Sequence, residues 1–312
     1  MSLSKLFTLA TLLVFTVIGV AAYSKNKPAK RISEPVALVE VVQEQEAEIP
    51  GATEEAMDLP INDPSLPSAN RIDELFNKRE PRMPIVETIT YKAYVPWKKG
   101  KPAWISDYAS HYKTSRHFIA RSLNNKADYE KQDVADGDKF NVLRDDKEFS
   151  FHLLVDILTS RMWFYYKDGE TNEKVLIKSY DVGLGRPDPY SPSGILTPLG
   201  TYTLGEKVGI YRPKMMQYHQ GENTEMIRVF GTRWIPFCDE LKDCTADAKG
   251  YGIHGLPWKE NEQNELVEDR QSLRQYASDG CIRLTTEDIE ELFSIIITRP
   301  TTIEIVRGFK NG

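Results

Sequence analysis

Histidine and cysteine are scarce in this chain, and basic residues are outnumbered by acidic ones. Its 312 residues hold 40 Lys and Arg against 46 Asp and Glu, which gives a formal net charge of −6. That balance is the opposite of the basic surface on which nucleic-acid-binding proteins rely, so we expect no nucleic-acid partner. The chain has five His and three Cys, and it contains no CxxC or HExxH pattern. We therefore predict no metal and no cofactor.

Long apolar runs are also missing, with one exception at the N-terminus. Residues 6–22 carry no charge, follow Lys5 and end in small residues at which a signal peptidase can cut. The run also has the minimum length of a membrane-spanning helix, about 17 residues. Residues 1–22 are therefore predicted to be a signal peptide or a membrane anchor of an exported protein of the periplasm or cell envelope. Basic residues follow the run and outweigh the positive charge before it, which by the positive-inside rule disfavours an outward-facing C-terminus. Whether the segment is cleaved or retained as an anchor stays open.

The three cysteines gain meaning if the chain is exported, because disulfides persist in oxidising compartments. Cys238 and Cys244 flank the short polar stretch "DELKD". Their proximity in the sequence favours pairing of these two over the other combinations. Cys281 would then be an odd cysteine, which marks it as a candidate reactive thiol.

Two segments precede the C-terminal half. Residues 23–86 are rich in Pro and Glu with little apolar periodicity, so we predict a disordered linker. Residues 87–145 form a small α+β unit: a strand in "ETITYKAYV", helical spacings that are broken near Lys113–Ser115, and a Gly-Asp turn into a last strand.

The region 148–308 is dominated by short strands and turns, which indicates a mainly β sandwich or barrel. Examples are "FHLLVDILTSRMWFYYKDG", with a turn near Leu158–Ser160, and the closing strand "TTIEIV". One helix is expected in "LTTEDIEELFSIIITRP". Thr285 and Asp288 resemble a capping box, apolar residues follow at helical spacing, and Pro300 lies just past the end.

Two short stretches carry residues with the chemistry of a nucleophilic site, "YGIHG" (251–255) and "SDGC" (278–281). A cysteine attacks as its thiolate, and a histidine that takes the proton allows this near neutral pH. Gly280 leaves backbone N–H groups beside Cys281 open to a developing oxyanion. By spacing alone, however, a lone Cys and a lone His are more often unrelated core or surface residues.

"TPLGTY" (197–202), "YGIHG" and "SDGCIRL" together resemble the YkuD-type L,D-transpeptidases, over roughly residues 148–307. The resemblance implies a β-rich catalytic domain without a metal that acts on peptidoglycan stem peptides. It implies Cys281 as the nucleophile and His254 as the general base. The remaining residues assigned to the oxyanion or substrate site are Gly280, Arg283, Ser278, Asp279 and Gly255.

The reaction implied by the resemblance is acyl transfer. Cys281 releases the terminal D-Ala of a tetrapeptide stem, and an amine of a second stem then forms a cross-link between two third-position diamino acids. Hydrolysis or exchange of the terminal residue is the alternative, and so is a non-catalytic peptidoglycan-binding protein.

Two features depart from the family pattern. Asp279 stands where the family most often has His, and a carboxylate there opposes thiolate formation. The alternatives are that Arg283 offsets this charge, that Asp279 points away or orients His254, or that it is a tolerated turn residue. The separation of His254 from Cys281 is longer than usual. The extra segment 256–276 is charged, and we expect it to form a helix over the site. It would act as a lid or an acceptor-selecting insertion, or it is a passive surface excursion.

Residues 87–145 resemble a divergent LysM module, which implies binding to the glycan of peptidoglycan. The front of the unit, "VPWKKGKPAW", departs from the LysM pattern, so a purely structural role stays open. The matching residues are Tyr108-Ala109, Thr114-Ser115, Ile119, Leu123-Asn124-Asn125, Gly137-Asp138 and Val142.

Overall fold

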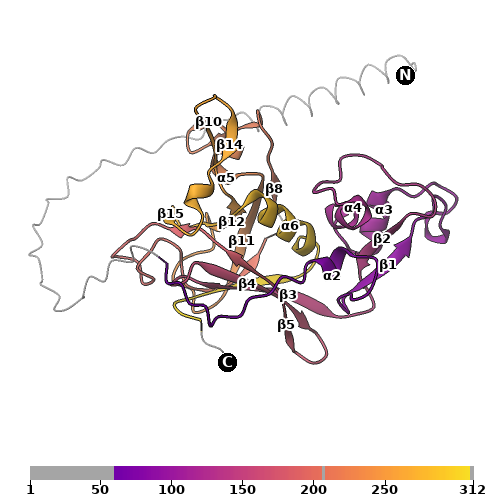
Figure 1. Ribbon diagram of the computed structural model, residues 1–312, viewed down its shortest axis with the longest axis horizontal. Coiled ribbons are helices and arrows are strands. Elements are labelled where there is room, and N and C mark those ends of the chain that lie inside the picture. Colours follow the sequence, from indigo (N-terminus) through magenta and orange to yellow (C-terminus); the bar gives the residue numbers. More distant parts are fainter. Residues whose placement is uncertain (1–59, 206–207, 310–312) are drawn as a thin grey trace, which may run out of the picture. The chain divides into compact units, whose positions relative to one another are not determined.

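The computed structural model describes residues 60–205 and 208–309 (Figure 1). The predicted signal peptide or anchor at 1–22, and residues 23–59 of the predicted linker, lie outside this range. Within the described residues no helix is long and apolar enough to cross a membrane.

From residue 60 onward the predicted linker is part of the packed structure. It contains the short helix α2 (Asp73–Phe76), and its backbone bonds to the edge strand β5 (Lys174–Asp181) through Arg71 N–H and Ile177 O at 2.8 Å. The prediction of a disordered linker is therefore wrong for residues 60–86. The buried apolar residues of this segment are few and are interrupted by charged residues and prolines, so only their partner surface reveals their burial. They are Ile72, Leu75, Phe76, Met83, Ile85 and Val86.

The next unit has the predicted order of strand, two helices and strand. Its strands pair antiparallel, from Val86 opposite Leu143 to Thr90 opposite Lys139. The predicted break between the helices is confirmed, because Ser115 caps the second helix by accepting a hydrogen bond from His117 N–H at 3.1 Å. The elements are β1 (Val86–Thr90), η1 (Pro96–Lys98), α3 (Ile105–His111), α4 (Arg116–Asn124) and β2 (Lys139–Leu143).

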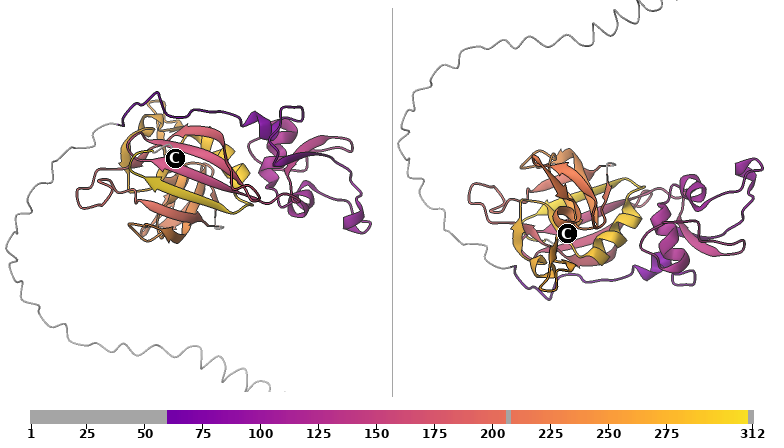
Figure 2. Two further views of the ribbon diagram at one scale, coloured as in Figure 1. Left: turned by 90° about the horizontal axis from the view of Figure 1, so that it is seen from below. Right: turned by 90° about the horizontal axis from the view of Figure 1, so that it is seen from above.

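The C-terminal part is built on a mixed sheet, so the mainly β prediction is confirmed. Among the described residues this sheet has nine strands, in the order β16-β12-β11-β7-β17-β3-β4-β5, with β8 paired to β11. Strand β17 runs parallel to β3 and antiparallel to β7, and in Figure 2 it is the yellow strand beside the magenta ones. Its strands are β3 (Phe149–Asp156), β4 (Arg161–Asp168), β5, β7 (Gly200–Leu204), β8 (Gly209–Ile210), β11 (Arg233–Lys242), β12 (Gly252–Gly255), β16 (Ile282–Leu284) and β17 (Thr301–Val306).

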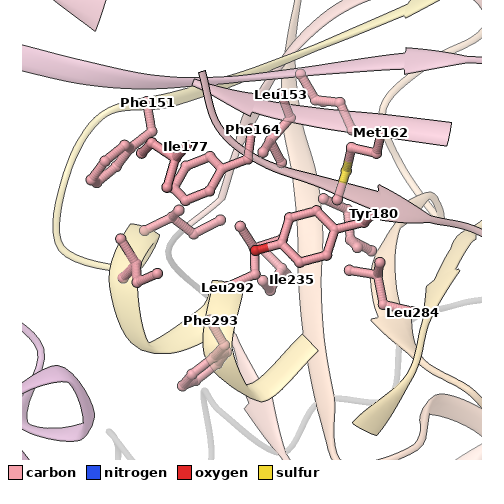
Figure 3. Close-up of a cluster of buried hydrophobic side chains, with 14 of the residues drawn as sticks. Phe151, Leu153, Met162, Phe164, Ile177, Tyr180, Ile235, Leu284, Leu292 and Phe293 are labelled. Carbon is pink, nitrogen blue, oxygen red and sulfur yellow. The ribbon is translucent and has the colours of Figure 1, made fainter. Parts of the chain in front are cut away.

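Helix α6 (Thr286–Ile296) covers one face of this sheet, as the capping box and the apolar spacing predicted. Thr285 Oγ1 accepts a hydrogen bond from Asp288 N–H at 3.2 Å. In Figure 3, Leu292 and Phe293 of the helix lie below aromatic and aliphatic side chains of the strands. Burying each such side chain contributes about 1.5–3 kcal/mol, which anchors the helix that follows the SDGC stretch.

Shorter elements surround the sheet near the predicted site. We expected a helix in the charged segment 256–276, and this expectation is wrong. The segment forms a short hairpin followed by one 3₁₀ turn. The hairpin pairs Trp258 with Glu268, so the charged residues lie at an exposed turn rather than on a helix face. These elements are β6 (Leu184–Gly185), β9 (Met216–His219), β10 (Glu222–Glu225), α5 (Ile227–Phe230), β13 (Trp258–Glu260), β14 (Leu266–Glu268), η2 (Arg270–Ser272) and β15 (Tyr276–Ser278).

Candidate active site

The SDGC turn between β15 and β16 holds Cys281 in a fixed position. Ser278 is buried, and its hydroxyl accepts from Gly280 N–H at 3.1 Å and donates to Cys281 O at 2.7 Å. Gly280 has φ +110°, and a Cβ there would lie 2.5 Å from the ring of Tyr251 and 2.7 Å from Leu196 O. Only glycine fits this turn. Because its N–H is engaged by Ser278, Gly280 contributes to the site through its conformation.

Strand pairing brings Cys281 and His254 to one face of the sheet. Strands β12 and β16 are parallel, with Ile253 opposite Ile282 and His254 opposite Arg283. Extending this register by one residue places Cys281 opposite Gly252. Since side chains alternate along a strand and cross-strand partners share a face, His254, Cys281 and Arg283 all project from the same side. The Sγ atom of Cys281 lies 3.6 Å from Gly250 O.

His254 is a buried, neutral imidazole whose tautomer is determined by its neighbour. Its Nδ1 lies 2.7 Å from Gly255 O. A carbonyl oxygen only accepts hydrogen bonds, so Nδ1 carries the proton and Nε2 keeps its lone pair. Burial lowers the pKa of His254 to about 3; the bond to Gly255 opposes this shift and the charge of Arg283 adds to it. The ring centroids of Phe230 and Trp234 lie 5.3 and 6.0 Å from that of the His254 imidazole.

Cys281 is a protonated thiol in the resting site. Burial raises its pKa to about 11, and the charge of Asp279 acts in the same direction. The Gly252 N–H and the charge of Arg283 oppose the shift. The thiol and imidazole therefore form a neutral pair rather than a thiolate–imidazolium pair, and attack by sulfur requires proton transfer to a base at the same time.

Arg283 supplies positive charge beside this pair. It acts on both Cys281 and His254, and burial lowers the pKa of its own guanidinium. Its Nε is buried and has no hydrogen-bond partner among residues 60–205 and 208–309. A cation with a spare donor at this position suits negative charge that develops or binds next to Cys281.

Asp279 is paired with a residue that the sequence patterns did not identify. The guanidinium of Arg186 binds its carboxylate, and both side chains are mostly exposed, 61% for Arg186 and 78% for Asp279. Arg186 lies just after β6, in "GLGRPDPYSPSG", which reads from composition only as a turn-forming loop. The one sequence feature that could have pointed to Arg186 is that it is the single arginine in this glycine- and proline-rich loop.

The "TPLGTY" stretch supports the turn from behind. Thr197 is buried, and its hydroxyl accepts from Gly185 N–H of β6 at 2.8 Å. Strand β6 in turn pairs in parallel with β15, with Ser278 opposite Gly185. This stretch therefore positions the backbone that leads into Cys281, and its role in the structure is one of support.

The expected pairing of Cys238 with Cys244 is not found, and all three cysteines are free thiols. Cys238 lies within β11, which continues to Lys242 before Cys244 is reached. Four residues of strand span about 13 Å, whereas the Cα atoms of a disulfide lie within about 7 Å. Proximity in the sequence misleads here because the intervening residues are extended.

No group of three or more His, Cys, Asp or Glu side chains that could hold a metal ion occurs in the described part of the chain. The four remaining histidines of the sequence, His111, His117, His152 and His219, are thus not assembled into a metal centre there.

Comparison with known proteins identifies the family of the C-terminal half. Residues 150–305, half of the chain, match the profile of YkuD, the L,D-transpeptidase catalytic domain. The chain belongs to the YkuD family. The match agrees with the region 148–308 proposed from the motifs, and Cys281, His254 and the supporting "TPLGTY" stretch all lie within it.

Solved structures align with part of this chain at low identity. Bd1075 of Bdellovibrio bacteriovorus is 16% identical with a TM-score of 0.33, and 51% of this chain is matched to 48% of that one. The helical cell shape determining protein Pgp2 of Campylobacter jejuni is 14% identical with a TM-score of 0.34, covering 52% and 49%. The chain thus spans about half the length of these proteins. No curated protein matches the sequence.

Proposed function

We propose that this YkuD protein is a peptidoglycan L,D-transpeptidase that works through a covalent acyl-enzyme on Cys281. The observation that carries the proposal is the shared face of β12 and β16, on which His254 and Cys281 project together. The Nδ1–H of His254 is committed to Gly255 O, so its Nε2 is left as the proton acceptor.

In the first half-reaction, Sγ of Cys281 attacks the carbonyl at the L-centre of the third stem residue while its proton passes to His254 Nε2. The neutral pair makes these events simultaneous, because a thiol with pKa about 11 holds little free thiolate. Arg283 and the Cys281 N–H stabilise the oxyanion. The carbon–nitrogen bond to D-Ala then breaks, His254 returns the proton to the leaving amine, and a thioester remains.

In the second half-reaction an amine attacks the thioester. If the amine is the side chain of a second stem, the product is a cross-link between two third residues; water gives a carboxypeptidase, and free D-amino acids give exchange. All three outcomes use the same groups on Cys281 and His254. They differ only in the acceptor.

The remaining parts of the chain suit an enzyme of the cell envelope. We assign residues 1–22 to export or anchoring, residues 87–145 to an attachment module and residues 148–308 to catalysis. In the module, Trp104 and Tyr94 flank the loop before α3 and are 53% and 68% exposed. Aromatic rings at an exposed loop are suited to contact sugar rings, which supports glycan binding by this LysM-like unit.

The catalytic proposal is tested with the purified full chain and a tetrapeptide-stem muropeptide, followed by mass spectrometry. We expect loss of D-Ala and a covalent adduct on Cys281, both absent in Cys281→Ala. His254→Gln is expected to retain the fold and lose acylation. A folded protein with a free Cys281 thiol that forms no adduct and releases no D-Ala would instead support the non-catalytic binding protein.

Glycan binding is tested separately by sedimentation with insoluble peptidoglycan. Trp104→Ala is expected to reduce the bound fraction, whereas Leu241→Ala, an equally exposed apolar residue of β11 at 54% exposure, is the matched control. Equal binding by both variants would leave the unit with a structural role.

A further inference from the structure

We propose that Arg186 and Asp279 form a subsite that binds a zwitterionic α-amino acid group of the substrate, with the ammonium and the carboxylate on one carbon. This inference rests on the proposed function, because it concerns the side chain of the stem residue whose carbonyl is attacked. Arg186 would bind the carboxylate and Asp279 the ammonium. The pair is present in the resting structure beside the nucleophile.

Backbone pairing holds the main chain of both residues close to Cys281. Strands β6 and β15 are paired, and Arg186 N–H donates to Ser278 O at 2.9 Å, one residue before Asp279. Asp279 is two residues before Cys281, so their Cα atoms are at most about 7.6 Å apart. A stem side chain of three methylene groups that ends in an amino acid centre spans a comparable distance.

The pair also has unused hydrogen-bonding capacity. It uses Nη1 of Arg186 and Oδ1 of Asp279. A guanidinium has five N–H donors and a carboxylate has two acceptor oxygens, and both side chains are mostly exposed. A ligand with an adjacent cation and anion can therefore bind across the pair and complete it, rather than compete with it.

Stability alone does not account for charges at this position. An exposed ion pair contributes little to stability, and the charge of Asp279 raises the pKa of the neighbouring Cys281 thiol. A carboxylate here is thus a disadvantage to the nucleophile that the pair hardly repays in folding. Recognition of an ammonium group gives the carboxylate a use, and Arg186 both offsets its charge and recognises the other half of the ligand.

The chemistry distinguishes three stem side chains. One that ends in ammonium and carboxylate engages both residues, one whose carboxylate is amidated loses the charged contact with Arg186, and a lysine-type amine engages Asp279 alone. A charge-assisted hydrogen bond lost in this way corresponds to roughly a 10- to 100-fold loss of affinity. We expect affinity to fall in that order.

The experiment measures binding of three tetrapeptides, identical except for this side-chain end, to the full chain carrying Cys281→Ala, by calorimetry. Arg186→Gln is expected to weaken binding of the zwitterionic peptide about 10-fold or more. The affinity for the amine-only peptide is expected to change by no more than about twofold. Arg186→Lys should restore part of the difference. Arg144→Gln breaks another exposed ion pair, with Asp146 at 2.6 Å, and serves as the matched control with no expected effect.

Turnover and thiol reactivity separate the possible failures. D-Ala release is measured with the same peptides, and iodoacetamide alkylation of Cys281 reports reactivity without any peptide. If the three peptides bind equally, if none binds, or if Arg186→Gln weakens all of them alike, the subsite is refuted. If the zwitterionic preference is present and depends on Arg186 but no D-Ala is released, the subsite stands and the proposed transpeptidase reaction fails.

Discussion

Removing the carboxylate of Asp128 is expected to destabilise the protein strongly, because it is the closest counter-ion of a buried arginine. Arg233 of β11 is 1% exposed, and its Nη2 lies 2.5 Å from Asp128 Oδ1 and 3.4 Å from Glu290 Oε1. Its Nε is buried without a partner in the described part of the chain. Asp128→Asn thus leaves a desolvated cation whose remaining anion, Glu290, lies farther away at 3.4 Å.

Two estimates of the magnitude agree. Breaking one side of a buried ion pair costs roughly 3–5 kcal/mol, and the remaining Glu290 places the expected loss near the lower end, about 3 kcal/mol. Independently, burial would raise the pKa of Asp128, but the neighbouring His117 and the charge of Arg233 lower it from 3.8 to about 2. That shift corresponds to roughly 2 kcal/mol of stability at neutral pH.

Urea unfolding at pH 7, followed by tryptophan fluorescence, measures the loss. Arg233→Met is expected to cost a similar amount. The double variant should lose clearly less than the sum, because neither Asp128 nor Arg233 is then left charged without the other. The stabilisation is fully present above about pH 4, since the pKa of Asp128 is lowered on folding, and it is lost as the pH falls through about 2. A single-variant loss below about 1 kcal/mol, or additive losses, would refute the reasoning.

Three further outcomes are expected. The alkylation rate of Cys281 should rise about tenfold per pH unit from pH 7 to pH 10, because its pKa is raised to about 11 and that of His254 is lowered to about 3; a plateau below pH 8 would indicate an ion pair instead. Gly280→Ala should abolish acylation and lower the unfolding midpoint, since its Cβ would lie 2.5 Å from the Tyr251 ring; wild-type rates would contradict the turn described here. Leu292→Ala should cost about 2–5 kcal/mol in urea unfolding, because Leu292 is fully buried against the sheet, and a loss under 1 kcal/mol would show that the site relaxes.

Local sequence signals predicted the elements whose residues carry a regular pattern. The cap at Thr285, the apolar face of α6 and the stop at Pro300 all act within a few residues, so the helix is readable from the sequence. The hairpin of β3 and β4 and the closing strand β17 follow in the same way from β-branched and aromatic residues beside turn signals.

The candidate site is divided between the two kinds of information. Cys281 and His254 were identified from short motifs, because the resemblance to a family lies in adjacent residues. Their approach depends on the parallel pairing of β12 with β16. The segment between them was expected to be helical and is a hairpin, since Trp258 and Leu266 pack with the aromatic residues around Phe230, a contact that charge pattern does not report.

By itself, the sequence predicted the mainly β class, the patterned elements and the candidate pair Cys281 and His254. Only the tertiary structure decided that residues 60–86 pack against the core, that Arg186 pairs with Asp279 and that Asp128 neutralises Arg233. These partners are far apart in the chain and follow no helical or strand period. Their proximity is set by strand order and loop closure, which depend on the free energy of the whole fold rather than on any local preference.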